Sequence, residues 1–387
     1  MLYNAVDYFN IEELLSEEEK LIMYSVREFV ENEVIPIIGE HYLNATFPME
    51  LIPKMSELGL LGITLPTELG GAGANYTSYG LAMMELERGD SAIRSFASVQ
   101  NSLVIYPIYT YGTEVQKKKW LPKLASGEVI GCFGLTEPDY GSNPSGMLTN
   151  AKKIDGGYLL NGAKMWITNG TLADVAVVWA KLDGVIHGFL VEKGTKGFSA
   201  PEMKGKLSLR ASVTSELIFE DCEIPDENLI NIKGLKGPLS CLTQARFGIS
   251  WGAVGAAMAV YDSSVQYAKS RIQFGKPIAS FQLVQEKLVW MLNEITKAQL
   301  IAYRLGRLKD EGKDRFQQTS LAKRNNVDMA LTACRVAREI HGANGILYEY
   351  HIMRHAANLE SVKTYEGTDD IHTLILGEDI TGIPAFE

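Results

Sequence analysis

The chain has 387 residues, of which 46% are hydrophobic and 22% charged, an ordinary composition for a globular protein of two or three domains. Its formal net charge of −10 argues against nucleic acids and anionic membranes as partners, and no apolar run is long enough to span a bilayer. Any anionic ligand must therefore be bound by local basic groups or by helix N-termini.

The cysteines and the N-terminus bear on the compartment. Cys132, Cys222, Cys241 and Cys334 are far apart and form no Cys-x-x-Cys pair, which predicts reduced, packed thiols. Residues 1–19 have neither the apolar core of a secretion signal nor the arginines of a transit peptide. We therefore expect a cytoplasmic protein, or one of the mitochondrial matrix, its transit peptide absent here, if the host is a eukaryote.

Residues 16 to about 126 have the apolar spacing of helices. Ser16 and Glu19 match a capping box at the start of the first helix, and further helices are predicted over Lys54–Leu61 and Tyr79–Arg88. The glycine cluster Gly70–Gly73 lacks the spacing and the strand-to-helix context of a dinucleotide-binding fingerprint, so it predicts a turn.

Residues from about 128 to 236 instead have the alternating pattern of β-strands. Two Asp-Gly pairs, Asp155-Gly156 and Asp183-Gly184, predict tight hairpin turns between such strands. The predicted strand cores are Tyr158–Leu160, Val175–Ala180, His187–Val191 and Glu216–Glu220.

After Pro238 the helical spacing returns, as in Leu283–Ile295 and Leu321–Val336, and the Ala- and Gly-rich segment Gly252–Met258 suits close helix–helix contact. His351 and His355 lie four residues apart, but no third ligand is apparent, so helix packing is favoured and no metal is predicted. We predict an α+β fold with an N-terminal helical domain (1–127), a middle β domain (128–236) and a C-terminal four-helix bundle (237–387).

Four segments together resemble the acyl-CoA dehydrogenase family: Phe133–Ser142 (FGLTEPDYGS), Trp166–Thr168 (WIT), Arg271–Lys276 (RIQFGK) and Thr364–Thr368 (TYEGT). Each alone is weak evidence, but all four in this order are specific, and the resemblance extends from about residue 85 to the C-terminus. It implies the family's three-domain fold, FAD as cofactor, and α,β-dehydrogenation of an acyl-CoA.

Glu366, taken alone, would be interpreted as a solvated loop carboxylate before Gly367. The resemblance makes it the catalytic base, which removes the proton next to the thioester while hydride leaves the following carbon for the flavin. A carboxylate that becomes desolvated when substrate binds is a stronger base than one in water. Gly367 lets the backbone approach the substrate closely, and the adjacent amide can stabilise the developing enolate.

The resemblance implies a first group of FAD-binding residues in the middle domain. Thr136 would bond the isoalloxazine edge, and Ser142 would lie near both FAD and the CoA arm of the substrate, although both residues also suit plain turns. Asn143 stands where the family commonly has Asp, so the charge is lost but an acceptor oxygen is kept. The group comprises Phe133, Leu135, Thr136, Ser142, Trp166 and Thr168.

A second FAD group is implied in the C-terminal domain. In the family the Arg of the RIQFGK motif reaches the FAD pyrophosphate of a neighbouring subunit, which implies a homo-oligomer, a tetramer by analogy. Arg246 is the expected basic contact to CoA, with a structural ion pair as the alternative. Asp369 departs from the family's common His or Ser and adds charge near the flavin. The group comprises Arg271, Phe274, Gln282, Glu339, Gly342, Thr368 and Asp370.

Arg94 lies in an otherwise small or apolar stretch, Ser91–Tyr106, where a structural salt bridge is the alternative to a binding role. The chain is most similar to the branch of the family that acts on glutaryl-CoA, in which an Arg in this segment binds the distal carboxylate, with Ser95 and Ser98 in reach. A monocarboxylic substrate would leave such an Arg unpaired, which is unfavourable. Segments Ser208–Ser212 and Ile375–Phe386 resemble the same branch.

Glu87, Tyr365 and Thr168 match polar positions of relatives that decarboxylate, so we expect conversion of glutaryl-CoA to crotonyl-CoA and CO2, a reaction of amino-acid catabolism. The family passes its electrons to electron-transfer flavoprotein. The alternatives are a non-decarboxylating glutaryl-CoA dehydrogenase, a dehydrogenase or oxidase for short monocarboxylic acyl-CoA, and a non-catalytic helical scaffold.

Overall fold

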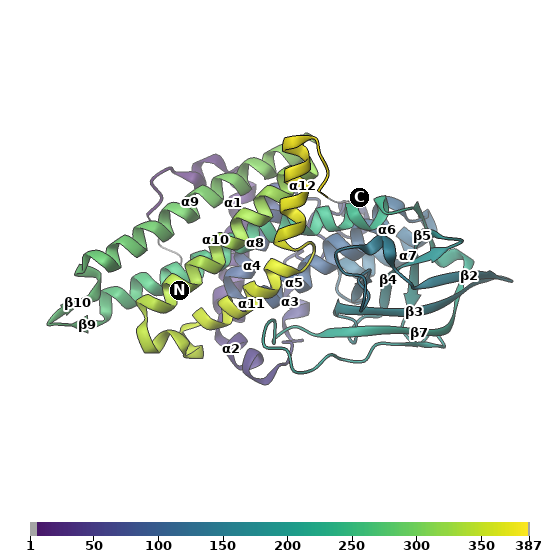
Figure 1. The fold of residues 1–387 in the computed structure, drawn as a ribbon, viewed down its shortest axis with the longest axis horizontal. Coiled ribbons are helices and arrows are strands. Elements are labelled where there is room, and N and C mark those ends of the chain that lie inside the picture. Colours follow the sequence, from purple (N-terminus) through teal and green to yellow (C-terminus); the bar gives the residue numbers. More distant parts are fainter. Residues whose placement is uncertain (1–5, 386–387) are drawn as a thin grey trace.

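The structure, a computed structural model, describes residues 6–385. Figure 1 shows a helical bundle at one end of the long axis and a β domain at the other, with N-terminal helices between them. Along the chain the order is the predicted one of a helical, a β and a helical domain, whereas in space the β domain lies at one end and not between the helical domains. No helix in residues 6–385 is long and apolar enough to span a membrane.

The first helix begins where the sequence predicts it, since the Ser16 hydroxyl accepts from the Glu19 amide and the Glu19 carboxylate accepts from the Ser16 amide. The predicted helix over Lys54–Leu61 is displaced, because the chain already turns at Gly59 with a φ of 69°. The helices are α1 (Glu17–Phe29), α2 (Ile35–Asn44), α3 (Leu51–Glu57), α4 (Tyr76–Gly89), α5 (Ser91–Ser98), α6 (Tyr106–Tyr111) and α7 (Glu114–Ala125), with π-helical turns at Val30–Val34 and Val99–Ile105.

The middle domain is an eight-stranded sheet in the order β6-β7-β3-β2-β4-β5-β8, with β1 paired to β4. Both Asp-Gly hairpins are confirmed, since Ile154 pairs with Gly157 and Leu182 pairs with Val185. The strands are β1 (Gly131–Gly134), β2 (Asn150–Ile154), β3 (Gly157–Thr168), β4 (Val175–Leu182), β5 (Val185–Glu192), β6 (Phe198–Ser199), β7 (Thr214–Pro225) and β8 (Leu229–Lys233).

The C-terminal domain is built on three long helices that lie side by side in Figure 1. A small hairpin of β9 (Ile272–Gln273) and β10 (Lys276–Pro277) joins the first two at the far end of the bundle. The helices are α8 (Lys236–Ser270), α9 (Gln282–Asp310), α10 (Phe316–Ile340), α11 (Ile352–Thr364) and α12 (Asp369–Thr381).

Glycines bring α8 against α4, as the Gly252–Met258 segment predicts. A Cβ on Gly255 would lie 1.8 Å from the carbonyl oxygen of Met84, and one on Gly252 would lie 2.0 Å from a carboxylate oxygen of Glu87. At Gly255 the two backbones are therefore too close for any side chain, whereas at Gly252 the Glu87 carboxylate occupies the place that a side chain would need. This contact fixes α4, and with it Glu87, beside the helix that carries Arg246.

Gly255→Ala should lower the thermal midpoint, because the added methyl forces α8 away from α4 at a cost of about 1–3 kcal/mol. Gly377→Ala is the matched control, since a Cβ there meets nothing within 4 Å and Ala favours helix α12. Calorimetry of both variants tests the contact. Equal midpoints for the two would contradict it.

Candidate active site

Glu366 lies in the short connection between α11 and α12. Its φ of 54° is left-handed, a conformation that costs a non-glycine residue about 1–3 kcal/mol, and Gly367 follows with a φ of 98°. The side chain is half-buried, and its Oε2 is fully buried without a hydrogen-bond partner. An unsatisfied buried carboxylate oxygen is expected of a group that faces a ligand rather than water.

Three consecutive carbonyls of this connection accept hydrogen bonds from buried cations. Lys323 of α10 donates from Nζ to the carbonyls of Tyr365 and Gly367, each at 2.6 Å, and Arg246 of α8 donates from Nε to the carbonyl of Glu366 at 2.6 Å. Charge-assisted hydrogen bonds of this kind hold the left-handed backbone in place. The side chain of Arg246, expected to bind CoA, therefore contacts the base itself, and its role toward CoA stays a prediction.

Burial raises the pKa of Glu366 above its ordinary value, while the nearby charges of Arg94, Lys323 and Arg246 oppose that rise. His372 of α12 lies near the same cations. Its burial, together with the charges of Lys323 and Arg246, lowers its pKa to about 3. The imidazole is therefore neutral. The carboxylate is a better base than one in water, but the cations keep it ionisable.

Arg94 of α5 is fully buried and points toward the same connection. Its Nε donates to the Glu87 carboxylate at 2.6 Å, and its Nη2 donates to the hydroxyl of Tyr365. Nη1 of Arg94 and the hydroxyl of Ser98 are buried without a hydrogen-bond partner. Arg94, Glu87, Tyr365 and Ser98 are thus brought together, and two buried polar atoms, Nη1 of Arg94 and the Ser98 hydroxyl, are left for a ligand.

The expectation that a monocarboxylic substrate leaves Arg94 unpaired is wrong. A monocarboxylic substrate would not leave Arg94 without a counter-ion, because Glu87 already provides one. The preference for a diacid must come instead from the unpartnered Nη1 and from the charge balance of the whole cluster.

The first FAD group lies where β1 ends and β3 ends. The Met165 amide donates to the Thr136 carbonyl at 2.9 Å, which joins the two motifs. Trp166 has a φ of 64° and is 58% exposed, beside half-buried Thr168. Ser142 is exposed and Asn143 accepts from Ser145, as expected for a turn. A large aromatic ring turned outward next to threonine hydroxyls fits a flat, hydrogen-bonding ring system.

Phe133 and Leu135 differ from this pattern. Both side chains are buried in the core of the sheet, with Phe133 in edge-to-face contact with Trp179. The expected contact of these two residues with FAD would therefore have to involve their backbone, because their side chains are buried.

A buried ion pair holds the Thr136 loop. Lys164 of β3 donates to the Glu137 carboxylate at 2.8 Å and to the Leu135 carbonyl at 3.0 Å, and Glu137 also accepts from the amides of Leu148 and Thr149. Burial lowers the pKa of Lys164 to about 8, while Glu137 opposes the shift. Neither residue was singled out from the sequence, since an acid and a lysine 27 positions apart give no local signal.

The second FAD group lies at the opposite end of the long axis, around the β9–β10 hairpin (Figure 1). Arg271, Glu339 and Gly342 line one shallow hollow there. Phe274 at the hairpin tip is 92% exposed, and Gln282 is exposed too. The Glu339 side chain is already paired with Lys287 at 2.7 Å, so a contact of this residue with FAD would involve its backbone.

Thr368 and Asp370 lie instead at the start of α12, next to Glu366. The Thr368 hydroxyl accepts from the Ile371 amide and caps the helix, while Asp370 is exposed. Asp369 lies 3.5 Å from Arg324, so the charge that this departure from the family adds has a partner of its own.

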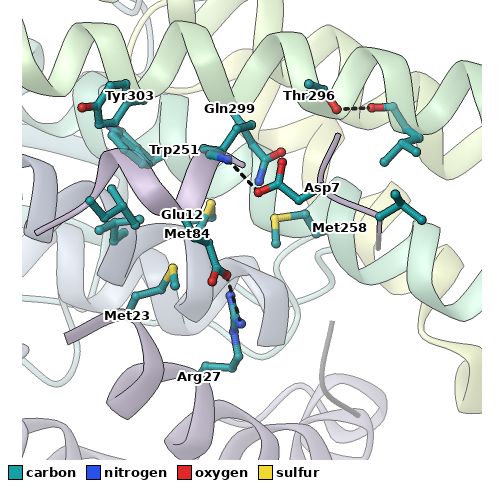
Figure 2. Close-up of a pocket in the computed structure, with 15 residues that line it drawn as sticks. Asp7, Glu12, Met23, Arg27, Met84, Trp251, Met258, Thr296, Gln299 and Tyr303 are labelled. Atoms are coloured by element: carbon teal, nitrogen blue, oxygen red, sulfur yellow. Dashed lines mark hydrogen bonds and ion pairs between the residues drawn. The ribbon is translucent and has the colours of Figure 1, made fainter. Parts of the chain in front are cut away.

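A second hollow lies elsewhere in the described residues. Figure 2 shows Met23, Met84 and Met258 around a space between the N-terminal segment and helices α4, α8 and α9. None of its lining residues belongs to the cluster around Glu366. It is therefore not the candidate site.

Comparisons with known proteins agree with this geometry. Models of the N-terminal, middle and C-terminal domains of acyl-CoA dehydrogenases match residues 16–128, 132–222 and 233–381. An acyl-CoA dehydrogenase from Bacillus subtilis is 37% identical over 95% of this chain and 99% of its own length, and human mitochondrial short-chain specific acyl-CoA dehydrogenase is 36% identical over 94% and 90%.

Two crystal structures of a glutaryl-CoA dehydrogenase from Mycobacterium smegmatis are 50% identical to this chain, each with a TM-score of 0.96. They cover 97% and 98% of this chain and 98% of their own, and one is a complex with FADH2. The chain belongs to the acyl-CoA dehydrogenase family. It is an FAD-dependent oxidoreductase, and the outward Trp166 with its threonine neighbours fits that cofactor, which supplies the hydride acceptor when bound.

Lys164→Met should weaken FAD binding by at least tenfold, because it leaves Glu137 buried without its cation and releases the Thr136 loop. Equilibrium titration of the apoprotein with FAD measures the effect. Lys152→Met, an exposed lysine of β2 in the same sheet, is the control and should bind FAD normally. Equal affinities for both variants would show that the ion pair does not order the loop.

Proposed function

We propose that the enzyme oxidises glutaryl-CoA and then decarboxylates the product to crotonyl-CoA. One observation carries the choice of a diacid: beside the base, the unpartnered Nη1 of Arg94 and hydroxyl of Ser98 are buried together. The cluster contains three cations, Arg94, Arg246 and Lys323, and two carboxylates, Glu87 and Glu366, so one further anion balances its charge. The distal carboxylate of a diacid is such an anion.

Glu366 removes the proton from the carbon next to the thioester. Its raised pKa favours proton uptake, and its left-handed backbone turns the side chain toward the cluster. The neighbouring carbon loses a hydride, for which FAD would supply the acceptor when bound. A backbone amide of the connection stabilises the developing enolate oxygen, a contribution typically of about 3 kcal/mol.

The second step begins with Glu366 protonated. The oxidised substrate loses CO2 because the electron pair left behind is delocalised into the unsaturated thioester, and Glu366 returns its proton to the terminal carbon. The Tyr365 hydroxyl and Ser98 line the region around Arg94, where the carboxylate leaves. The buried site keeps water from protonating the intermediate.

FAD is proposed to lie between two copies of the chain, so that the enzyme is a homo-oligomer, a tetramer by family analogy. Support comes from Figure 1, in which the β domain, which carries the first FAD group, and the β9–β10 hairpin of the second group lie at opposite ends of the long axis. Ser142 and Arg246 would flank the CoA arm. Electron-transfer flavoprotein is the proposed acceptor of the electrons.

A short monocarboxylic substrate is the second candidate function. It is favoured by the Arg94–Glu87 pair, which satisfies the arginine charge without a substrate carboxylate. The experiments on Arg94 and on the products separate the two.

Glu366→Gln should abolish reduction of the flavin by substrate and leave FAD bound, because the amide cannot accept the proton. Anaerobic stopped-flow absorbance measures bleaching of the bound flavin. Glu378→Gln, on the exposed face of α12, is the control and should bleach at the wild-type rate. Normal bleaching by Glu366→Gln would refute the assignment of the base.

Arg94→Met should reduce kcat/KM for glutaryl-CoA by about 3–5 kcal/mol of transition-state stabilisation, and should affect butyryl-CoA far less. Comparing the two substrates in one variant cancels any general damage from leaving Glu87 unpaired. An equal loss for both substrates would remove the diacid argument.

Product analysis with glutaryl-CoA and an artificial electron acceptor tests the second step. We expect crotonyl-CoA and CO2 in equal amounts. Accumulation of glutaconyl-CoA would instead identify a non-decarboxylating enzyme.

A further inference from the structure

Lys323 is the least expected member of the cluster around Glu366. It lies in the middle of α10, only 2% exposed, and its hydrogen-bond acceptors are the carbonyls of Tyr365 and Gly367. Its ammonium group also lies 5.9 Å from the centre of the Tyr365 ring. A buried lysine whose acceptors are neutral carbonyls is costly, so its position requires an explanation beyond helix packing.

Several charged groups act on Lys323 from the elements packed against it. Burial lowers the pKa of Lys323, and the charge of Glu366 opposes that shift. Arg246 from α8 and Arg94 from α5 add to the lowering, whereas Asp369 at the start of α12 opposes it, and neutral His372 faces the same space. Glu366 is thus the charge that acts most strongly on Lys323, and Lys323 follows Arg94 among the cations that act on Glu366.

We propose that Lys323 is a positioning residue, which fixes the backbone on both sides of Glu366 and thereby sets where the catalytic carboxylate lies and how readily it takes up a proton. This inference rests on the proposed role of Glu366 as the base. It assigns Lys323 two separable contributions, the hydrogen bonds and the charge.

The hydrogen bonds act on geometry. Glu366 has a φ of 54°, which ordinary residues avoid, and Lys323 bonds the residue before it and the residue after it. Without these bonds the connection can relax, and the carboxylate moves away from the substrate carbon. The limiting rate of flavin reduction then falls.

The charge acts on the acidity of Glu366. A buried cation favours the ionised carboxylate and so lowers its pKa, against burial, which raises it. Removing the cation raises the pKa of Glu366, so a higher pH is needed to ionise the base. The acid limb of the pH–rate profile therefore moves to higher pH. For a shift of one pH unit, the rate at the pH that is half-maximal in the wild type falls ~5-fold.

Two variants separate the contributions. Lys323→Gln keeps N–H donors but removes the charge, whereas Lys323→Met removes both. Lys297→Met, an exposed lysine of α9, is the matched control. Each FAD-loaded protein is mixed anaerobically with glutaryl-CoA from pH 5 to pH 9, and FAD content, thermal midpoint and a crystal structure of each variant are obtained.

Both Lys323 variants should bind FAD, and in both the acid limb of the pH–rate profile should move to higher pH. Lys323→Met should also lose at least ~10-fold in the limiting rate of flavin reduction and show an altered backbone at residue 366. If Lys323→Met does not fold, the shift in Lys323→Gln decides. An unchanged profile in the variants, even with a lowered thermal midpoint, would reduce Lys323 to a structural role and overturn the proposal. Failure of the wild type to bleach with any acyl-CoA would instead overturn the proposed function, and the role of Lys323 with it.

Discussion

A carboxylate confined among buried cations is the interaction on which the rest of this structure depends. Glu366 has an unpartnered, fully buried oxygen, and its backbone is held by Arg246 and Lys323 from two different helices. Burial makes the group a stronger base, and the cations prevent it from becoming a permanently protonated acid. The pKa of Glu366 depends on the balance between burial and these cations, and the helical domains fix the positions of both.

The architecture serves that balance through close contact of its helices. Because Gly255 has no side chain, α8 can approach α4 closely, and because Gly252 has none, there is room for the Glu87–Arg94 ion pair. Arg94 on α5 then points toward Tyr365 in the connection that carries the base. The binding and proton-transfer groups thus come from α4, α5, α8, α10 and the α11–α12 connection, and no single segment contains the site.

The sequence predicted those features whose signals are local. The capping box at Ser16, the two Asp-Gly hairpins and the glycine-rich contact of α8 each depend on neighbouring residues, and the structure contains all of them. The family motifs directed attention to Glu366 and Arg94, which the fold brings together. The outward Trp166 also agrees with the motif that contains it.

Features that depend on distant partners escaped prediction. Lys323 and Lys164 look like surface lysines of a helix and a strand, and only the tertiary structure shows that both are buried against backbone carbonyls or an acid. The pairing of Arg94 with Glu87 was also missed, although Glu87 itself was named, because the two residues lie on different helices, α4 and α5. Phe133 and Leu135 were assigned to FAD through their motif, but alternation along β1 and its continuation directs both side chains into the core.

The central claim is that Glu366 faces the α-carbon of an acyl thioester whose distal carboxylate is bound by Arg94. It is tested most directly by a crystal structure of the FAD-loaded protein with a glutaryl-CoA analogue that cannot be oxidised. The account predicts the Glu366 carboxylate in contact with the α-carbon, and Nη1 of Arg94 and the Ser98 hydroxyl on the distal carboxylate. A Glu366 side chain turned away from the bound thioester, or a distal carboxylate in solvent away from Arg94, would contradict it.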